Sequence, residues 1–417
     1  MDKFVVHGPC PLEGTVEISG AKNAVLPLIA ASLLARGRSV IENVPDLRDV
    51  KTMIRLLGML GADVRFEGGV LTIDTDNVNS VEAPYDLVRT MRASIYVLGP
   101  LVGAYQKARV SLPGGCAWGP RPIDLHLMAM EKLGAEIDLE HGYINASAKR
   151  LRGNEIVFPI ASVGATVQAI MAASLAEGVT TIQNAAIEPE VTELARALVG
   201  AGAQIEGIGS QTLTIDGVDA IQPFYYRVIP DRIEAGTFAA AAVATGGRVR
   251  IAHCSTSHLD AVLDALRMCG ATVESSEDHI EITGPDRIEA THVVTREYPG
   301  FPTDMQAQIM AVLARANGIS TVKDTIYPDR FTHVPELRRL GAIIRLDGNL
   351  AVITGVESFE GAPVMATDIR ASSALIIAAL AAEGRTDISR VYHIDRGYER
   401  IEAKLSALGA KIERVSE

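Results

Sequence analysis

The stretch LLGMLGADVRF at residues 56–66 decides the fold, because variants of it return along the chain at intervals of about 70 residues. The other copies are AMEKLGAEIDL (129–139), ALVGAGAQIEG (197–207), ALRMCGATVES (265–275), ELRRLGAIIRL (336–346) and KLSALGAKIER (404–414). In each copy, apolar residues at three- and four-residue spacing predict a helix, the glycine predicts its left-handed C-cap, and the alternation that follows predicts a strand. The chain is therefore built from repeated α/β units.

A second kind of segment lies between these copies. It is an alanine-rich run closed by glycine and a polar strand, as in IMAASLAEGVTTIQN (170–184) and FAAAAVATGGRVRIA (238–252). Thin alanine side chains let helices approach closely, which predicts buried helices with the sheets outside them. With the second strand that usually follows the first phrase, such as GVLTID (69–74), one unit reads strand, helix, strand, helix, strand, strand. Six such units predict an α/β fold with three units in each of two lobes.

The boundary between the lobes is expected in QPFYYRVIPDRIEAG (222–236), where Pro223 and Pro230 interrupt the periodicity. We expect a first lobe at 22–229 and a second lobe formed by 1–21 together with 230–417. The first twenty residues would then cross to the second lobe. A cleft between two such lobes is a natural ligand site.

Composition excludes several classes of function. The chain has 417 residues, 39 Lys and Arg against 51 Asp and Glu, and a net charge of −12, so nucleic acid and anionic membranes are repelled on average. Aromatic residues make up only 5%, too few for base-stacking platforms. The N-terminal residues do not read as a signal peptide and no apolar run is long enough to span a bilayer, so we expect a cytoplasmic protein.

One cysteine stands apart from the other three. Cys116 lies in SLPGGCAWGPRPIDLHL (111–127), a Gly- and Pro-rich loop that precedes a helix start. The helix N-terminus and Arg121 would bias this thiol toward the reactive thiolate, whereas the alternative is a small buried hydrophobic residue. Cys10, Cys254 and Cys269 are widely spaced and are interpreted as structural thiols. His126 follows helical spacing and is interpreted as packing.

Cations stand at junctions rather than along helix faces: Lys22, Arg92, Arg121, Arg330, Arg370 and Arg396. An anion placed there would meet side-chain charge and helix N-terminal amides together, so an anionic substrate is predicted, although each of these residues taken singly is better explained as a surface charge. Asp304, in GFPTDMQAQ (300–308), is read either as a helix cap or as a general base.

At this point the chain resembles a known family, the enolpyruvyl transferases. The motifs that carry the resemblance run in the family's order over essentially the whole chain: SGAKNA (19–24), MRASI (91–95), GGCAWGPRPIDLH (114–126), SVGAT (162–166), PDRIEAGT (230–237), GFPTDMQAQ (300–308), RFTHVPELRRLGA (330–342), DIRASSAL (368–375) and IDRGYERIE (394–402). The resemblance implies a pair of inside-out α/β barrels with the substrates between the lobes. It implies no metal and no organic cofactor.

The Gly-Gly-Cys loop favours the branch of the family that acts on a sugar nucleotide over the branch that acts on shikimate 3-phosphate. The implied reaction transfers the enolpyruvyl group of phosphoenolpyruvate to the 3'-hydroxyl of UDP-N-acetylglucosamine and releases phosphate through a tetrahedral ketal. This is the first committed step of peptidoglycan precursor synthesis. The alternatives are an enolpyruvyl transferase with another hydroxyl acceptor and a non-catalytic sugar-nucleotide sensor. We expect a monomer or weak homo-oligomer.

The family's roles carry over residue by residue. By resemblance, Cys116 gives a proton to the methylene carbon, can form a covalent adduct and is the target of fosfomycin. By the same resemblance, Asp304 lies near the attacking hydroxyl and is the base for the addition or for the later elimination. The resemblance makes Lys22, Arg121 and Arg396 a phosphate clamp and makes Arg330 and Arg370 partners of the substrate carboxylate. The residues that match nucleotide-binding positions are Asn23, Arg92, Arg121, Pro122, Ile123, Asp124, Leu125, Ser162, Val163, Gly164 and Ile326. Ile160 departs from the lysine that the family often has there, so one diphosphate contact is missing or is supplied elsewhere.

Overall fold

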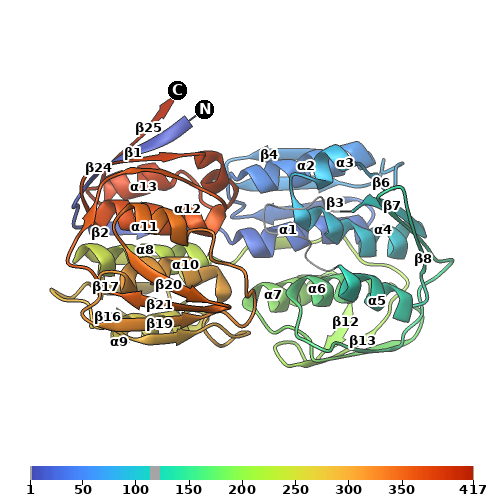
Figure 1. Ribbon diagram of the computed structural model, residues 1–417. Coiled ribbons are helices and arrows are strands. Elements are labelled where there is room, and N and C mark those ends of the chain that lie inside the picture. The colour runs from blue at the N-terminus through green and yellow to red at the C-terminus, as the bar shows by residue number, and fades with distance from the viewer. Residues whose placement is uncertain (1, 113–122, 417) are drawn as a thin grey trace. The chain divides into compact units, whose positions relative to one another are not determined.

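The computed structural model describes residues 2–112 and 123–416. The chain divides into two compact units. Gly20–Ile229 form one, called here the continuous unit, and Met1–Ser19 with Pro230–Glu417 form the other, called the split unit. In Figure 1 the continuous unit is coloured from blue to green, and most of the split unit from yellow to red. The chain therefore passes between the units twice, at Ser19–Gly20 and at Ile229–Pro230.

Within the described residues the predicted order of elements occurs five times in full and a sixth time without its last strand. The elements of the continuous unit are α1 (Lys22–Ala31), η1 (Ser32–Leu34), β3 (Arg38–Glu42), α2 (Arg48–Leu60), β4 (Asp63–Glu67), β5 (Val70–Asp74), β6 (Glu82–Ala83), α3 (Tyr85–Val88), η2 (Arg92–Val97), α4 (Leu98–Tyr105), β7 (Lys107–Ser111), α5 (Asp124–Lys132), β8 (Glu136–Glu140), β9 (Tyr143–Ser147), β10 (Glu155–Val157), α6 (Val163–Ala173), β11 (Val179–Gln183), α7 (Pro189–Gly200), β12 (Gln204–Glu206), β13 (Thr212–Asp216) and β14 (Tyr225–Arg227).

The split unit follows the same order, with two strands from the start of the chain. Its elements are β1 (Asp2–Gly8), β2 (Glu13–Glu17), α8 (Arg232–Thr245), β15 (Arg248–Ala252), η3 (Thr256–His258), α9 (Asp260–Met268), β16 (Thr272–Ser275), β17 (His279–Thr283), β18 (His292–Val294), η4 (Thr303–Met305), α10 (Gln306–Leu313), β19 (Ile319–Lys323), α11 (Val334–Arg339), β20 (Ile343–Asp347), β21 (Leu350–Thr354), β22 (Phe359–Glu360), β23 (Pro363–Met365), α12 (Ile369–Ala381), β24 (Ala382–Ser389), η5 (Val391–Arg396), α13 (Ile401–Ala407) and β25 (Lys411–Ser416).

The repeated glycines adopt the predicted backbone conformation. The φ angles of Gly61, Gly134, Gly202, Gly270, Gly341 and Gly409 all lie between 86° and 104°. A residue with a Cβ is strained in this region, so glycine ends each helix and turns the chain into the next strand at no steric cost. The prediction of six glycine-capped helices is confirmed.

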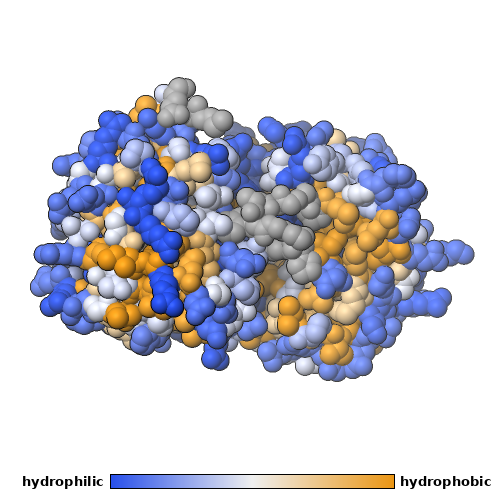
Figure 2. Space-filling view, viewed as in Figure 1, coloured by the Kyte–Doolittle hydropathy of each residue, from blue (hydrophilic) through white to orange (hydrophobic). Residues whose placement is uncertain are grey.

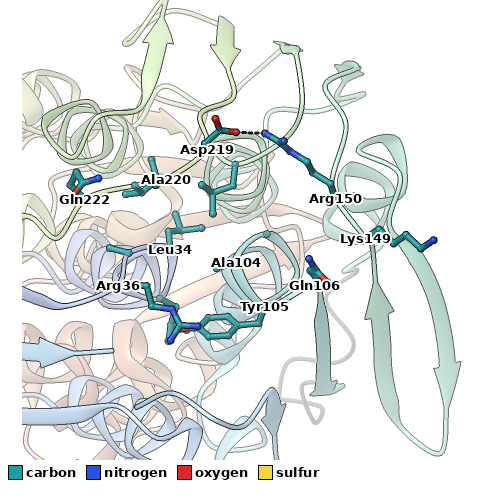
Figure 3. Close-up of a pocket in the computed structure, with 15 residues that line it drawn as sticks. Leu34, Arg36, Ala104, Tyr105, Gln106, Lys149, Arg150, Asp219, Ala220 and Gln222 are labelled. Atoms are coloured by element: carbon teal, nitrogen blue, oxygen red, sulfur yellow. Dashed lines mark hydrogen bonds and ion pairs between the residues drawn. The ribbon is translucent and has the colours of Figure 1, made fainter. Parts of the chain in front are cut away.

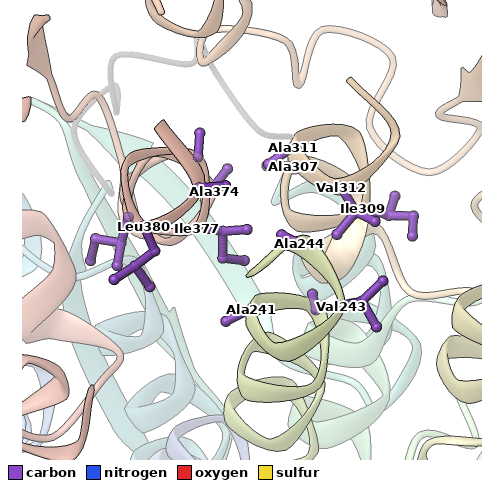
Figure 4. Close-up of a cluster of buried hydrophobic side chains, with 14 of the residues drawn as sticks. Ala241, Val243, Ala244, Ala307, Ile309, Ala311, Val312, Ala374, Ile377 and Leu380 are labelled. Carbon is purple, nitrogen blue, oxygen red and sulfur yellow. The ribbon is translucent and has the colours of Figure 1, made fainter. Parts of the chain in front are cut away.

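The alanine-rich helices form the interior of each unit. In the split unit α8, α10 and α12 contact one another, and α8 is buried from Arg232 to Ala244. Figure 4 shows their small and branched side chains meeting, among them Ala241, Ala311 and Ile377. In the continuous unit α4 packs on α6, and α1 packs on α7 and η2. Helices therefore lie inside and sheets outside, the inside-out α/β arrangement that the resemblance implied.

The described strands form six open sheets of one common design. In the order β10-β11-β13-β12, the first pair is parallel and the next two pairs are antiparallel. In two sheets the parallel edge strand comes from a different repeat. β2 precedes β3 in the sequence but pairs with β15 of the split unit, and β14 precedes β15 but pairs with β3 of the continuous unit. β1 lies between β24 and β25 and supplies the strand that the sixth repeat lacks. A strand from the first residues thereby completes the sheet of the sixth repeat.

The crossing at Ser19–Gly20 is tightly constrained on the continuous side. A Cβ on Gly20 would lie 1.8 Å from the backbone oxygen of Asn43, so only glycine fits this approach. The next residue, Ala21, donates its backbone N–H to Ile229 O at 2.8 Å. These contacts fix the backbone just before Lys22, the first residue of α1.

The surface is largely hydrophilic, with apolar patches over the sheets in the view of Figure 2. Ile319 and Ile343 are 59% and 57% exposed, and both pair with Thr354 in the register of β19, β21 and β20. Among the described helices, none combines the length and the apolar character needed to cross a membrane.

Two glycines at the end of α7 provide a matched test of the cap. Gly202 has φ +98° and Gly200 ends the helix, and a Cβ on either one would meet no atom within 4 Å. We expect Gly202→Ala to lower the free energy of unfolding by about 1–2 kcal/mol, because only the left-handed backbone is penalised. Gly200→Ala should be neutral or stabilising by up to about 1 kcal/mol. Urea unfolding midpoints measure both, and equal effects would contradict the cap.

Candidate active site

The split unit brings three of the predicted site residues into one ion-pair cluster. Asp304 lies in η4, ahead of α10, and its Oδ1 and Oδ2 accept from Arg330 Nη1 and Arg370 Nη2, each at 2.8 Å. Arg370 belongs to the first turn of α12, whereas Arg330 follows β19 in a loop. Residues far apart in the sequence thus meet where α10 and α12 begin.

Burial differs across this cluster. The side chains of Arg370 and Arg330 are 5% and 11% exposed, whereas that of Asp304 is 26% exposed. Burial is the largest single influence and lowers the pKa of the Arg370 guanidinium, but the charge and hydrogen bond of Asp304, together with Tyr398 and Asp231, outweigh it and raise this pKa above its ordinary value. The cluster therefore holds two cations on one carboxylate, and the carboxylate is the member nearest to solvent.

A buried carboxylate supports Arg330 from behind. Asp324 is fully buried, and its Oδ2 accepts from Thr303 Oγ1 at 2.7 Å. Its Oδ1 accepts from the backbone N–H of Ile326 and Tyr327 at 3.0 and 2.8 Å. Because Thr303 gives its hydrogen to Asp324, its oxygen is oriented to accept from Arg330 Nη1 at 3.1 Å. Neither Thr303 nor Asp324 was among the predicted site residues.

A hydroxyl chain supports Arg370 in the same way. Thr237 Oγ1 donates to Ile233 O, so Tyr398 donates to Thr237 at 2.8 Å and accepts from Arg370 Nη1 at 3.3 Å. Gln308 Nε2 also donates to the backbone oxygen of Asp304 at 3.0 Å. Tyr398 belongs to the IDRGYERIE motif, which had pointed only to Arg396.

The charge of Arg330 acts on the pKa values of two neighbouring groups, His333 and Asp368. Burial, followed by the charge of Arg330, lowers the pKa of His333 to about 3. Burial raises the pKa of Asp368, although Arg330 opposes this effect. Asp368 caps α12, since its Oδ1 accepts from the backbone N–H groups of Arg370 and Ala371. An anion that reached Arg330 and Arg370 would therefore also meet the N-terminus of α12.

The continuous unit carries Lys22 and Asn23 at the first residues of α1. Lys22 Nζ lies 3.8 Å from Asp49 Oδ2, and its side chain is only 13% exposed. Arg92 begins η2, and Ser162 caps α6 by accepting from Ala165 N at 3.4 Å. These predicted residues share one feature, namely that each stands at the N-terminal end of an inner helical segment.

His126 joins two of the predicted nucleotide segments. It lies in α5, which begins at Asp124, and a Cβ on Gly164 would come within 2.8 Å of its Nε2. The segments 123–125 and 162–164 therefore approach each other through this ring. Burial and then the charge of Arg92 lower the pKa of His126 to about 4, while Asp124 opposes the shift. In the described part of the chain its Nδ1 has no hydrogen-bond partner.

The remaining predicted site residues fall into two groups. Cys116, Arg121 and Pro122 lie outside the described residues. Arg396 ends η5 and is partly buried, Ile326 is 38% exposed, and Ile160 is 62% exposed just ahead of the α6 cap. Cys10, Cys254 and Cys269 are buried, and burial raises the pKa of Cys254 to about 11 and of Cys269 to about 12.

A pocket of about 390 Å³ lies elsewhere in the continuous unit, at the C-terminal ends of its inner helices (Figure 3). Arg150 pairs with Asp219 at 2.8 Å on one side, and Arg36 lies over the Tyr105 ring on the other. The lining includes none of the predicted site residues. Nowhere in the described ranges do three or more His, Cys, Asp or Glu side chains gather as a metal site would require.

A family model described as EPSP synthase (3-phosphoshikimate 1-carboxyvinyltransferase) matches residues 6–405. The chain belongs to this family of enolpyruvyl transferases. It is 54% identical over 419 residues to the UDP-N-acetylglucosamine 1-carboxyvinyltransferase of Acinetobacter guillouiae, with 100% of both chains covered. It is 52% identical over 417 residues to the enzyme of that name from Geobacter metallireducens, again with 100% of both covered.

Solved structures agree with this membership. The enolpyruvyl transferase NikO from Streptomyces tendae superposes with a TM-score of 0.91 at 26% identity, covering 100% of this chain and 99% of that one. EPSP synthase from Acinetobacter baumannii, at 19% identity, has a TM-score of 0.77 with both chains fully covered, which supports the fold alone. The predicted fold and the predicted class, a transferase, are confirmed.

The lowered pKa of His126 generates a prediction for stability. Its folded pKa of about 4 lies below its ordinary value of 6.5, so the unfolded chain binds the extra proton first and stability falls as the pH drops from 6.5 toward 4. The loss should be about 3 kcal/mol for this residue alone. Urea unfolding of the wild type and of His126→Gln at several pH values measures it. Parallel stability profiles would contradict a buried neutral imidazole.

Proposed function

We propose that this chain transfers the enolpyruvyl group of phosphoenolpyruvate to the 3'-hydroxyl of UDP-N-acetylglucosamine and releases phosphate, as the first committed step of peptidoglycan precursor synthesis. The observation that carries the proposal is the identity of 52–54% along the full chain to relatives named for this activity. The ion-pair cluster of Asp304, Arg330 and Arg370 supports it, because the reaction needs cations for an anionic substrate and a carboxylate for a hydroxyl.

The anionic groups of phosphoenolpyruvate are assigned to separate sets of cations. Arg330 and Arg370 present guanidinium groups that suit a carboxylate, and the start of α12 adds a favourable dipole. Lys22, Arg121 and Arg396 are assigned to the phosphate. Together these cations stabilise the tetrahedral ketal, in which both negative groups remain attached to one carbon.

The chemistry then divides between an acid and a base. In the addition step, Asp304 takes the proton of the 3'-hydroxyl while the hydroxyl oxygen bonds to C2 of phosphoenolpyruvate. Cys116 gives a proton to C3. In the elimination step the Cys116 thiolate takes a proton back from C3, the C2–C3 double bond forms again, and phosphate departs with the C–O bonding electrons.

The nucleotide is assigned to the continuous unit and to Ile326. The proposed contacts are Asn23, Arg92, the stretch 121–125 and the segment Ser162–Gly164. The backbone N–H groups at the start of α6 suit a diphosphate oxygen. At Ile160 an exposed apolar side chain replaces a charge that the family often supplies, so Arg92 and the α6 terminus carry more of the diphosphate binding.

The proposed location follows from the substrates. Both are charged metabolites of the cell interior, so we place the reaction in the cytoplasm. The chain is proposed to act as a monomer or weak homo-oligomer, with small molecules as its only required partners.

The deciding experiment incubates the purified protein with phosphoenolpyruvate and UDP-N-acetylglucosamine and measures released phosphate. Release with this acceptor and none with shikimate 3-phosphate is the expected result. The opposite preference would support the alternative of another hydroxyl acceptor, and no release with either would favour a sugar-nucleotide sensor.

Cys116 provides a test of the acid. Cys116→Ala should reduce the rate of phosphate release by about 100-fold or more, because general acid catalysis contributes on that scale, with the thermal unfolding transition unchanged. Cys254→Ala is the matched control, since this thiol is buried and its pKa is raised by burial. An alanine variant with wild-type turnover would remove Cys116 from the mechanism.

A reactive Cys116 should also be alkylated by fosfomycin. Intact-mass analysis of the folded protein, incubated with fosfomycin and UDP-N-acetylglucosamine, should detect one adduct in the wild type and none in Cys116→Ala. An unmodified wild-type protein would contradict a nucleophilic thiol at this position.

A further inference from the structure

The Asp304 carboxylate accepts from two guanidinium groups at once, one on each oxygen. A carboxylate held in this way takes up a proton less readily than a solvated one, because both neighbours favour its charged form. The same residue is the base of the proposed function. A base that is already neutralised by two cations is poorly suited to that role, so something must remove the cations before it acts.

The substrate carries what is needed to remove them. Phosphoenolpyruvate has a carboxylate of its own, and the proposed function assigns it to Arg330 and Arg370. Each arginine can make a paired hydrogen bond with either carboxylate, but the two anions compete for the same N–H groups. We propose that Arg330 and Arg370 are exchanged from Asp304 to the substrate carboxylate on binding, and that this exchange turns Asp304 into an active base.

The structure indicates which partner moves. Asp304 is the most exposed member of the cluster and lies on a short 3-10 turn, η4, ahead of α10. Both arginines are held from behind, Arg330 by Thr303 on the buried Asp324 and Arg370 by Tyr398 on Thr237. An arriving anion therefore meets arginines that stay in place, and the carboxylate is displaced toward solvent.

The other charged groups near the cluster do not substitute for the substrate. Asp368 faces Arg330 but accepts two backbone N–H bonds as the cap of α12. Asp231 acts on Arg370 from a distance and caps α8 through the backbone of Ile233 and Glu234. Both carboxylates are thus engaged elsewhere, and His333, with a pKa lowered to about 3, stays neutral. Asp304 is the carboxylate that the substrate replaces.

Exchange and a static ion pair predict opposite effects of removing Asp304. The probe is 2-phospholactate, which carries the carboxylate and phosphate of the substrate on a saturated carbon and cannot react. If Asp304 competes for the arginines, Asp304→Asn should abolish turnover and yet bind 2-phospholactate about tenfold more tightly or better, since the charged carboxylate no longer has to be separated from the two guanidinium groups. Equal or weaker affinity in a folded Asp304→Asn protein would overturn the proposal.

Asp329→Asn is the matched control, because it removes an exposed carboxylate next to Arg330 in the sequence. Its affinity for 2-phospholactate should equal that of the wild type. A tenfold gain in this control as well would show that the gain reflects general charge and would overturn the exchange. Circular dichroism and the thermal transition establish that each variant is folded.

A second measurement needs no variant. Released from two cations, the Asp304 carboxylate gains proton affinity, so binding of 2-phospholactate by the wild type should take up protons, and more of them as the pH is lowered toward the ordinary range of a carboxylate. Calorimetric titration in two buffers of different ionisation enthalpy measures this uptake, after subtraction of the ligand's own ionisation. Uptake above that value supports the exchange, and its absence overturns it.

This inference rests on the proposed function, and the two fail in different ways. The exchange alone is overturned if the wild type releases phosphate when both substrates are present, but Asp304→Asn does not bind 2-phospholactate more tightly and the wild type takes up no protons on binding it. A wild-type protein that neither releases phosphate nor binds 2-phospholactate overturns both.

Discussion

A buried guanidinium group has to be neutralised and hydrogen-bonded, and the split unit is organised around this requirement. Arg370 is almost fully enclosed at the start of α12, so Asp304, Tyr398 and the helix cap Asp368 must all lie near it. These residues come from η4, the segment after η5 and the loop before α12. Their convergence depends on α8, α10 and α12 packing closely, which alanine side chains allow. In this unit the geometry of the site therefore depends directly on how the core helices pack.

The direction of the inner helices gives this arrangement its chemical character. Lys22, Arg92 and Ser162 in one unit, and Asp304 and Arg370 in the other, all stand where inner helical segments begin. The peptide dipoles there favour anions, and the arginines and lysine add full charges. A protein with a net charge of −12 can thus assemble local positive sites. The pocket beside Tyr105 lies at the C-terminal ends of the inner helices, where the peptide dipoles do not favour anions.

Local chemistry explains what the sequence predicted well. The helix, glycine, strand phrase depends on the conformational freedom of one residue, and each of the six glycines has a positive φ. The individual charges at the site were likewise visible in short motifs. Their pairing was not, because Asp304 and Arg370 are 66 positions apart. No sequence motif indicated Asp324, since its role depends on hydrogen bonds from Thr303 and from the backbone of the loop that follows it. The sixth repeat shows the same limit, because its missing strand lies at the other end of the chain.

The position of β1 affects how the protein is made. A ribosome produces this strand long before its partners β24 and β25, which lie near the other end of the described residues. Throughout synthesis the strand carries unsatisfied backbone donors and acceptors, whereas residues 20–229 already contain a complete unit. The sheet can close only after β24 and β25 have been made. Truncated chains would keep an open edge, which chaperones and proteases can recognise, so the topology makes completion of translation a condition for a finished enzyme.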